Sequence, residues 1–184
     1  AEHVLIRIST DEGLVGVADA PPRPYTYGET QESIIAVVRD LFAPQLVGLD
    51  PLDREKAQRI MGRTVHNATA KGAIDIALWD LVGKALAVPV HRLLGGYADG
   101  MRVAHMLGFR PAPELLEEAL RFREQYGVTT FKLKTGRRPL ALDVEAARVL
   151  REGLGDEAEI YLDANRGWSA NEALEVLRRT EGLG

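Results

Sequence analysis

The sequence predicts an α/β protein in which an α+β unit is followed by the first three strand–helix units of a parallel barrel. Residues 3–19 have the pattern of a β-hairpin and residues 29–86 that of helices, whereas after Gly100 strand and helix patterns alternate without a hairpin signal. Repeated strand–helix units form parallel sheets with right-handed crossovers. The 184 residues fall short of the ~250 residues of a complete eight-unit barrel, so we expect a partial, truncated barrel.

The first region, residues 1–100, is expected to form the α+β unit. Val4, Ile6 and Ile8 fall on one face of a strand, and a turn leads into a second strand. Prolines and Gly28 exclude regular structure from residues 21–28, which form a loop. Apolar spacing predicts helices over three ranges, 29–42, 51–61 and 68–86. Because the chain starts without Met inside a predicted strand, we expect the first strand of this unit to be missing.

The second region, residues 101–184, is expected to contain barrel strands 1–3. The predicted strand and helix pairs are 103–109 with 113–126, 129–134 with 140–152, and 159–163 with 169–180. No glycine-rich phosphate loop follows any of these strands, which favours a barrel over a nucleotide-binding doubly wound sheet. Three units leave open sheet edges, so we expect a free chain to self-associate in gel filtration.

Two lysines are spaced for one face of the second barrel strand. Lys132 and Lys134 lie two residues apart, and if Leu133 faces the helices, both ammonium groups face the barrel interior near the carboxyl end, where barrel enzymes keep their active sites. Two cations held together repel, so one of them releases its proton more readily and can act as a base. The alternative is a pair of solvated lysines on an edge strand.

The third predicted barrel strand ends in a carboxylate and an amide. Asp163 and Asn165 share one face, and Asp163 is a candidate ligand for a hard cation such as Mg²⁺ or Mn²⁺. The alternative interpretation makes either residue a cap for the following helix. The lysine pair one strand earlier favours a site, because a cation and a metal can together stabilise an enolate beside a carboxylate.

Composition excludes several other classes of protein. The chain has no cysteine, which excludes disulfides and thiolate catalysis. A net charge of −4 without a basic tract argues against nucleic acid as a partner. The apolar runs are all shorter than the ~20 residues of a membrane-spanning helix, and no signal peptide opens the chain. We therefore expect a cytoplasmic protein with no membrane association.

Taken together, these motifs resemble the mandelate racemase and muconate lactonizing branch of the enolase superfamily. The resemblance rests on Lys132 and Lys134, on Asp163 and Asn165, on the apolar helix around residues 73–81 and on the closing turn at 89–96. It implies an enolase-like α+β capping domain and a modified TIM barrel. It also implies that Lys134 is the base or proton donor, Lys132 a cationic helper, Asp163 the first metal ligand and Asn165 a polar contact.

The same resemblance implies that two segments select a small carboxylate substrate. They are residues 21–28, with Tyr25 and Tyr27, and residues 64–69, with His66; each side chain could equally be a surface tyrosine or a helix-capping histidine. A full-length relative would be expected to form a homo-oligomer. For His105, on the first barrel strand, a packed or hydrogen-bonded role is preferred over a catalytic one, and the same holds for His3 and His91.

The activity implied is a metal-dependent cycloisomerase of aromatic catabolism that lactonizes cis,cis-muconate or a similar dicarboxylate through an enolate. A dipeptide epimerase and an o-succinylbenzoate synthase share the lysine pair and remain open. The non-enzymatic alternative is an inactive fragment with a structural or interaction role. The pattern calls for two more acidic ligands and an opposing lysine on later strands, so we expect the chain alone to be inactive or nearly so.

Overall fold

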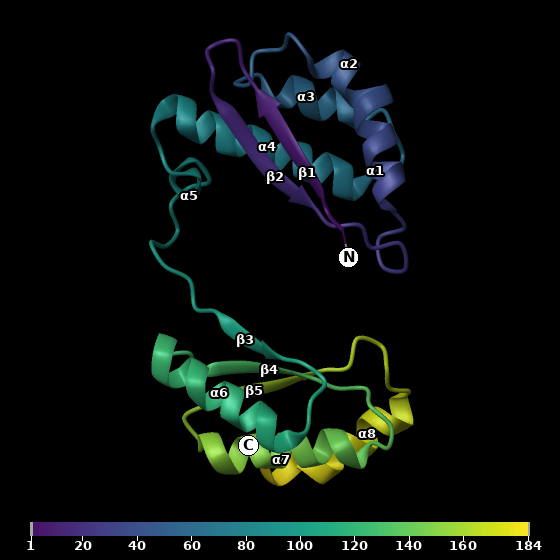
Figure 1. The fold of residues 1–184 in the computed structure, drawn as a ribbon, viewed down its shortest axis with the longest axis vertical. Coiled ribbons are helices and arrows are strands. Elements are labelled where there is room, and N and C mark those ends of the chain that lie inside the picture. Colours follow the sequence, from purple (N-terminus) through teal and green to yellow (C-terminus); the bar gives the residue numbers. More distant parts are fainter. Residues whose placement is uncertain (1, 184) are drawn as a thin grey trace. The chain divides into compact units, whose positions relative to one another are not determined.

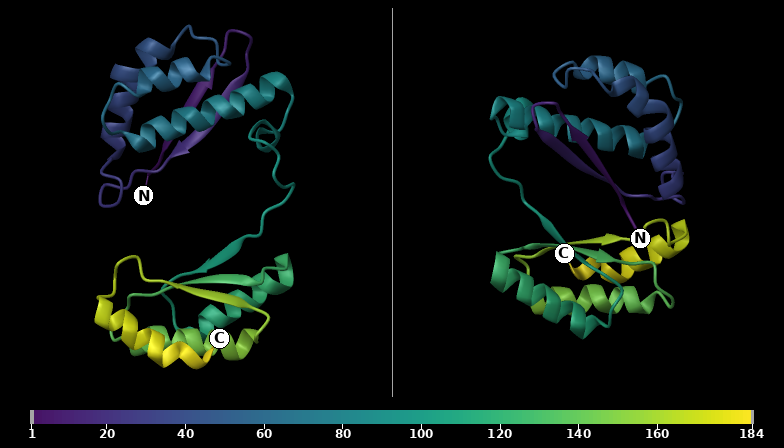
Figure 2. Two further views of the ribbon diagram at one scale, coloured as in Figure 1. Left: turned by 180° about the vertical axis from the view of Figure 1, so that it is seen from behind. Right: turned by 45° about the horizontal axis from the view of Figure 1, so that its top comes forward.

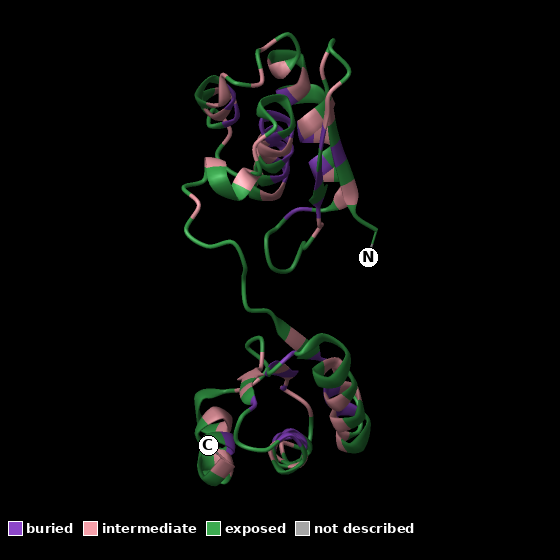
Figure 3. Ribbon diagram, turned by 90° about the vertical axis from the view of Figure 1, so that its left-hand side faces the viewer, coloured by how far each residue is buried: buried purple, intermediate pink, exposed green. Residues whose placement is uncertain are grey.

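The computed structural model describes residues 2–183, which fold as an α/β structure with a parallel sheet and flanking helices (Figure 1). The chain divides into two units, the first ending at Asp99 and the second beginning at Gly100. Each unit has its own cluster of buried apolar side chains. The ribbon of Figure 3 marks buried residues in both units. The α/β class predicted from the sequence is confirmed.

The first unit begins with the predicted hairpin. Strand β1 (Val4–Ser9) pairs antiparallel with β2 (Val15–Ala20), and Val4 lies opposite Ala20. Side chains alternate as expected for a strand with one buried face: Ile6 is buried, whereas Leu5 is 70% exposed. The hairpin therefore turns one apolar face toward the helices of its unit.

One long helix forms the centre of the first unit. The helices are α1 (Gln31–Val37), η1 (Val38–Phe42), α2 (Ala43–Leu46), α3 (Arg54–Met61), α4 (Ala68–Leu86) and α5 (Val90–Leu93). Helix α4 has the bounds predicted from its apolar spacing and packs along the hairpin, mainly against β2. Its buried residues include Ala70, Ala73 and Ala77, and these small side chains let the strand approach the helix closely.

The predicted single helix over residues 29–42 is wrong at both ends. It begins at Gln31 because Thr30 caps it: the Thr30 side chain accepts from the backbone of Ser33, whose hydroxyl accepts from Thr30 in return. At Val38 the α-helix widens into a π-helical turn and continues as α2. Pro44 has no N–H to complete an α-helical bond, and the wider turn accommodates this loss.

Glu29 lies outside helix α1, contrary to the prediction, and serves a different helix. Its buried carboxylate accepts hydrogen bonds from the backbone N–H groups of Thr69, at 2.7 Å, and Ala70, at 3.4 Å. These are unpaired donors of the first turn of α4, whose preceding residue Asn67 makes no side-chain cap. Helix α3 also starts later than predicted, because the preceding residues form a turn: the Asp53 N–H donates to the carbonyl oxygen of Asp50, and the Leu52 N–H to its carboxylate.

The second unit contains three parallel strands in the order β3-β4-β5. Its elements are β3 (Ala104–Leu107), α6 (Ala112–Tyr126), β4 (Thr130–Lys134), α7 (Ala141–Leu154), β5 (Glu159–Asp163), α8 (Ala170–Thr180) and η2 (Glu181–Leu183). Figures 1 and 2 show α6, α7 and α8 on the same face of this sheet. Among the described residues, no helix is both long and apolar enough to cross a membrane.

The central strand, β4, sets the position of its neighbours. Met106 of β3 and Tyr161 of β5 lie opposite Lys132, and Lys134 lies opposite Asp163. Strand β3 is shorter than the predicted range 103–109, because its pairing with β4 covers only four residues. The buried core of this unit lies between the sheet and helices α6 and α7.

A substitution at Gly16 would test the close packing of β2 against α4. A Cβ atom at this position would lie 2.1 Å from the carbonyl oxygen of Ala77 and 2.8 Å from Cβ of Leu81. Gly16→Ala should therefore destabilise the first unit by about 1–3 kcal/mol or more. Gly72→Ala, in the same α4 helix with open space around it, should instead stabilise it by about 0.5–1 kcal/mol.

The measurement is urea unfolding of the whole chain, followed through the indole signal of Trp79 in α4. Equal effects of the two glycine substitutions would contradict this account of the β2–α4 contact.

Candidate functional site

Four of the predicted site residues meet at the carboxyl ends of strands β4 and β5: Lys132, Lys134, Asp163 and Asn165. The alternation of β4 buries Phe131 and Leu133 completely on the helix side, which places Lys132 and Lys134 together on the opposite face. Because β4 and β5 are parallel and in register, Asp163 at the end of β5 lies beside Lys134. The face that carries the lysines is thus the face away from the helices.

Lys134 is held by two oxygen atoms of the neighbouring strand and loop. Its Nζ donates to Oδ2 of Asp163 at 2.7 Å and also to Oδ1 of Asn165. Lys132 Nζ lies 3.7 Å from the same Asp163 oxygen. The two lysine side chains are only 30% and 21% exposed and belong to the central strand, so the interpretation as solvated lysines on an edge strand does not describe them.

The Asp163 carboxylate is the charged centre of this group. Its pKa lies below the ordinary value for aspartate, chiefly because Lys134 donates a hydrogen bond to it. The backbone N–H of Asn165 and the two lysine charges act in the same direction, whereas partial desolvation opposes them. Asp163 is therefore ionised well into the acidic range and can pair with a cation throughout the neutral range.

The loop after β5 holds Asn165 in an uncommon backbone conformation. Asn165 and Arg166 have φ angles of 44° and 68°, both in the left-handed region that non-glycine residues seldom adopt. Such conformations cost free energy and concentrate at functional sites. Helix α8 is capped by Ser169 and Glu172 through a capping box, so neither Asp163 nor Asn165 serves as its cap. The capping interpretation of these two residues is wrong.

The described residues do not by themselves fit a divalent metal. Within residues 2–183, no three His, Cys, Asp or Glu side chains gather as they would to hold a metal ion. Both oxygens of Asp163 already accept hydrogen bonds, Oδ1 from Asn165 N–H at 3.1 Å and Oδ2 from Lys134. One carboxylate supplies too few oxygen ligands for Mg²⁺.

The three candidate substrate contacts of the first unit are exposed. Tyr25 is 97% and Tyr27 62% exposed, in a loop closed by N–H groups of residues 26–28 that donate to the carbonyl oxygen of Arg23. His66 is exposed in the segment before α4. Their role in substrate selection remains a prediction.

The other three histidines each lie beside a carboxylate. His105 faces helix α6, where its Nε2 lies 2.8 Å from Oε1 of Glu118 and its ring stacks on Phe122 at 3.5 Å. This confirms a packed, hydrogen-bonded role for His105. His3 lies 2.9 Å from Asp19, and His91 lies 3.6 Å from Asp99.

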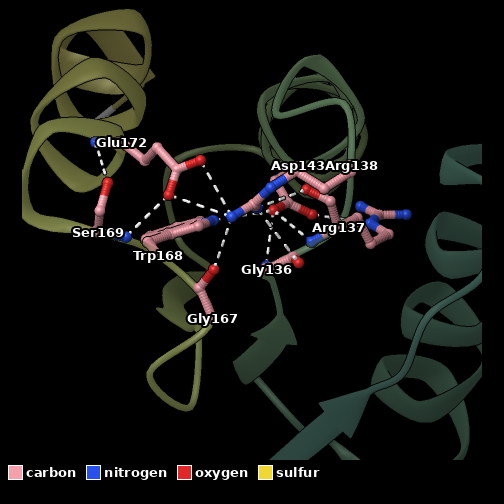
Figure 4. Close-up of polar contacts among 8 residues, drawn as sticks. All are labelled: Gly136, Arg137, Arg138, Asp143, Gly167, Trp168, Ser169 and Glu172. Atoms are coloured by element: carbon pink, nitrogen blue, oxygen red, sulfur yellow. Dashed lines mark hydrogen bonds and ion pairs between the residues drawn. The ribbon is translucent and has the colours of Figure 1, made fainter.

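Further residues complete the neighbourhood of the lysines. Met106 and Tyr161 flank Lys132 on the same face, and the period-two alternation of β3 and β5 was sufficient to find them. Asp143 is completely buried beneath the loop after β4 and binds both that loop and Trp168 (Figure 4). No local sequence pattern singles out Asp143, because one of its partners is 25 residues away.

The fold and the lysine–aspartate group define an α/β protein with a charged site at the carboxyl ends of parallel strands. A family model described as mandelate racemase/muconate lactonizing enzyme, N-terminal domain, matches residues 1–95. A second model, described as enolase C-terminal domain-like, matches residues 114–184. The chain belongs to the mandelate racemase/muconate lactonizing enzyme family of the enolase superfamily.

Individual relatives cover several reactions. The chain is 35% identical, over 95% of its length, to N-succinyl-L-Arg/Lys racemase of Bacillus cereus. It is 56% identical to a muconate lactonizing enzyme from Mucobacterium Smegmatis, with a TM-score of 0.94 over 100% of this chain and 52% of that one. An L-Ala-D/L-Glu epimerase of Bacillus subtilis is 30% identical, with a TM-score of 0.89 over 99% of this chain and 51% of that one. The chain spans about half the length of the curated relatives it matches.

The Lys134–Asp163 pair makes a prediction about pH. Because the folded pKa of Asp163 is lowered, the pair contributes stability above the unfolded pKa and loses it as the pH falls through the folded pKa. In Lys134→Met the main cause of the shift is removed, so the Asp163 pKa should rise. The measurement is a carboxyl-carbon NMR titration in EDTA, with Lys84→Met, which removes the ion pair of Asp80 instead, as the control. An Asp163 midpoint that is unchanged in Lys134→Met would contradict this assignment.

Proposed function

We propose that this chain carries the lysine acid–base machinery of a cycloisomerase that lactonizes muconate or a similar dicarboxylate. The observation that carries the proposal is the group of Lys132, Lys134 and Asp163 at the carboxyl ends of β4 and β5. The 56% identity to a muconate lactonizing enzyme supports this substrate class over the others. A related structure of that enzyme is described as a complex with muconolactone.

In the proposed reaction Lys134 delivers one proton. One substrate carboxylate oxygen adds to a carbon of the double bond, which forms the lactone C–O bond and moves the electron pair onto the carbon beside the other carboxylate. Lys134 transfers a proton from Nζ to that carbon and is then reprotonated from solvent. The dianion and one proton thus give a lactone monoanion. Lys134 suits this role because its Nζ donates hydrogen bonds to Asp163 and Asn165, which fix its position.

Lys132 is proposed to attract the negative charge of the substrate, and Asn165 to orient the Lys134 and Asp163 side chains. Lys132 lies farther from Asp163 than Lys134 does, so its ammonium group is the freer of the two to attract a substrate carboxylate. Asn165 accepts from Lys134 through its side chain and donates to Asp163 through its backbone, and so limits the rotation of both. Met106 and Tyr161 give the surface beside Lys132 an apolar and aromatic character.

We propose further roles for these residues within a protein as long as the curated relatives. Asp163 would supply one ligand of a Mg²⁺ or Mn²⁺ ion, the cofactor type that this family generally uses. Tyr25, Tyr27 and His66 would contact the carboxylate substrate. A cytoplasmic homo-oligomer acting in aromatic catabolism is proposed on the family resemblance alone.

A second candidate function is racemisation or epimerisation of an amino acid derivative or dipeptide. It is favoured by the similarity to N-succinyl-L-Arg/Lys racemase and L-Ala-D/L-Glu epimerase. Such a reaction requires proton removal and return beside a carboxylate or its amide, which a lysine can also perform. In both candidate reactions a carbon atom of the substrate acquires hydrogen from solvent. That substrate is muconate in the first candidate and an amino acid derivative or dipeptide in the second.

The test offers the chain muconate, N-succinyl amino acids and dipeptides in D₂O with Mg²⁺ or Mn²⁺, and follows deuterium incorporation by NMR. We expect slow lactonization of muconate, because the chain provides a single carboxylate for the metal. Lys134→Ala should lower the rate by about 10²-fold or more, the size of a general acid–base contribution. Lys84→Ala, which removes an ion pair with Asp80 in α4, is the matched control and should keep the rate.

The alternatives give different outcomes. Deuterium exchange into a dipeptide or an N-succinyl amino acid, without lactonization, would favour the second candidate. A folded chain that exchanges none of the substrates would contradict an enzymatic role for these residues alone and favour a structural or interaction role.

A further inference from the structure

Asp143 is a completely buried carboxylate in the first turn of α7, beneath the loop that follows the lysine strand. Its Oδ2 accepts from the backbone N–H of Gly136 at 2.7 Å and of Arg137 at 3.1 Å, and its Oδ1 accepts from Nε of Arg137 at 2.7 Å. Gly136 is two residues after Lys134. The carboxylate thus fixes the backbone of the two residues that begin this loop, Gly136 and Arg137 (Figure 4).

The same carboxylate also reaches the loop after β5. Nε1 of Trp168 donates to Oδ2 of Asp143 at 3.3 Å. Trp168 belongs to the same loop as Asn165. A cap that served α7 alone would not need this bond, since Trp168 lies 25 residues after Asp143 and just before α8. Asp143 therefore joins the loop that follows Lys134 to the loop that contains Asn165.

Two further contacts hold these loops together. Gly136 and Gly167 meet through their backbones: a Cβ atom on Gly167 would lie 3.2 Å from Cα of Gly136 and 2.9 Å from the carbonyl oxygen of Ala164. Nη2 of Arg138 donates to the carbonyl oxygen of Gly167 at 2.9 Å and to Oε2 of Glu172 at 3.1 Å. Figure 4 shows these residues between the starts of helices α7 and α8.

We infer that Asp143 is a positioning residue that sets the Lys134–Asn165 hydrogen bond by tying the loop after β4 to the loop after β5. Asn165 depends on such support, because it and Arg166 adopt left-handed backbone conformations that the surroundings must hold in place. No hydrogen bond or ion pair joins Asp143 to Lys134 itself, so Asp143 acts through the backbone of Gly136 and through Trp168. Its importance for turnover rests on the proposed function; its effect on the geometry does not.

The hydrogen bonds around Asp143 require a carboxylate at this position and not an amide. One buried oxygen accepts three N–H donors while the other faces the Arg137 guanidinium, so every neighbour is a donor. In Asp143→Asn one of the two oxygens becomes an NH₂ donor of the same size. Either the Arg137 guanidinium or the loop donors would then face another donor, and one set of bonds must be lost.

The experiment compares Asp143→Asn with Leu150→Ala in the whole chain. Leu150 is completely buried in the same helix but belongs to the apolar core, so its loss lowers stability without touching the loops. We expect both variants to unfold at lower urea concentration. Only Asp143→Asn should shift the side-chain amide signal of Asn165 and the ammonium signal of Lys134 in ¹H–¹⁵N NMR spectra.

Trp168→Phe provides a milder variant if Asp143→Asn does not fold. It removes one hydrogen bond to Asp143 and keeps an aromatic ring, and it should shift the same two signals in the same direction by a smaller amount. Unchanged Asn165 and Lys134 signals in a folded Asp143→Asn or Trp168→Phe chain would overturn the inference. Equal shifts in Leu150→Ala would also overturn it, since stability alone would then explain them.

The NMR readout separates this inference from the proposed function. Shifted signals together with a muconate turnover lowered about tenfold or more would support both. If Asp143→Asn shifts the two signals but the wild-type chain turns over no substrate, the positioning role is established and the proposed function alone is contradicted.

Discussion

The two-residue alternation of β4 is the constraint on which the candidate site depends. Phe131 and Leu133 are completely buried against the helices, and burial of such side chains contributes about 1.5–3 kcal/mol each. A shift of the strand by one residue would exchange them with Lys132 and Lys134 and bring two ammonium groups into an apolar core. The apolar packing of the helix side therefore determines where the lysines lie.

The charge balance of the site indicates what it can bind. Two ammonium groups share one nearby carboxylate, and the longer distance belongs to Lys132, so the group carries an excess of positive charge. Partly exposed ion pairs contribute little to stability, about 0–1 kcal/mol. An arrangement that adds little stability yet keeps a cation available fits the binding of an anionic substrate better than a purely structural role.

Sequence patterns predicted those features that depend on local periodicity. The hairpin, helix α4, strand β5 and the shared face of Lys132 and Lys134 all follow from apolar spacing of two or about 3.6 residues. The change from α1 to a π-helical turn at Val38 could not be predicted from apolar spacing. Pro44 lies in the following helix α2, where the wider turn accommodates it and the helical segment continues. The substrate contacts expected from Tyr25, Tyr27 and His66 depend on more than local pattern and remain predictions.

Contacts between distant residues account for the rest of what the sequence did not predict. Glu29 has the local appearance of a helical residue, but its carboxylate caps α4, some 40 residues away, and so fixes the end of the loop 21–28 to the segment 64–69. Asp143 joins the loops after β4 and β5 in the same manner. In both units a buried carboxylate accepts backbone N–H groups and ties together two segments that carry candidate site residues. Burial makes each bond costly to lose, and this gives otherwise irregular segments a defined position.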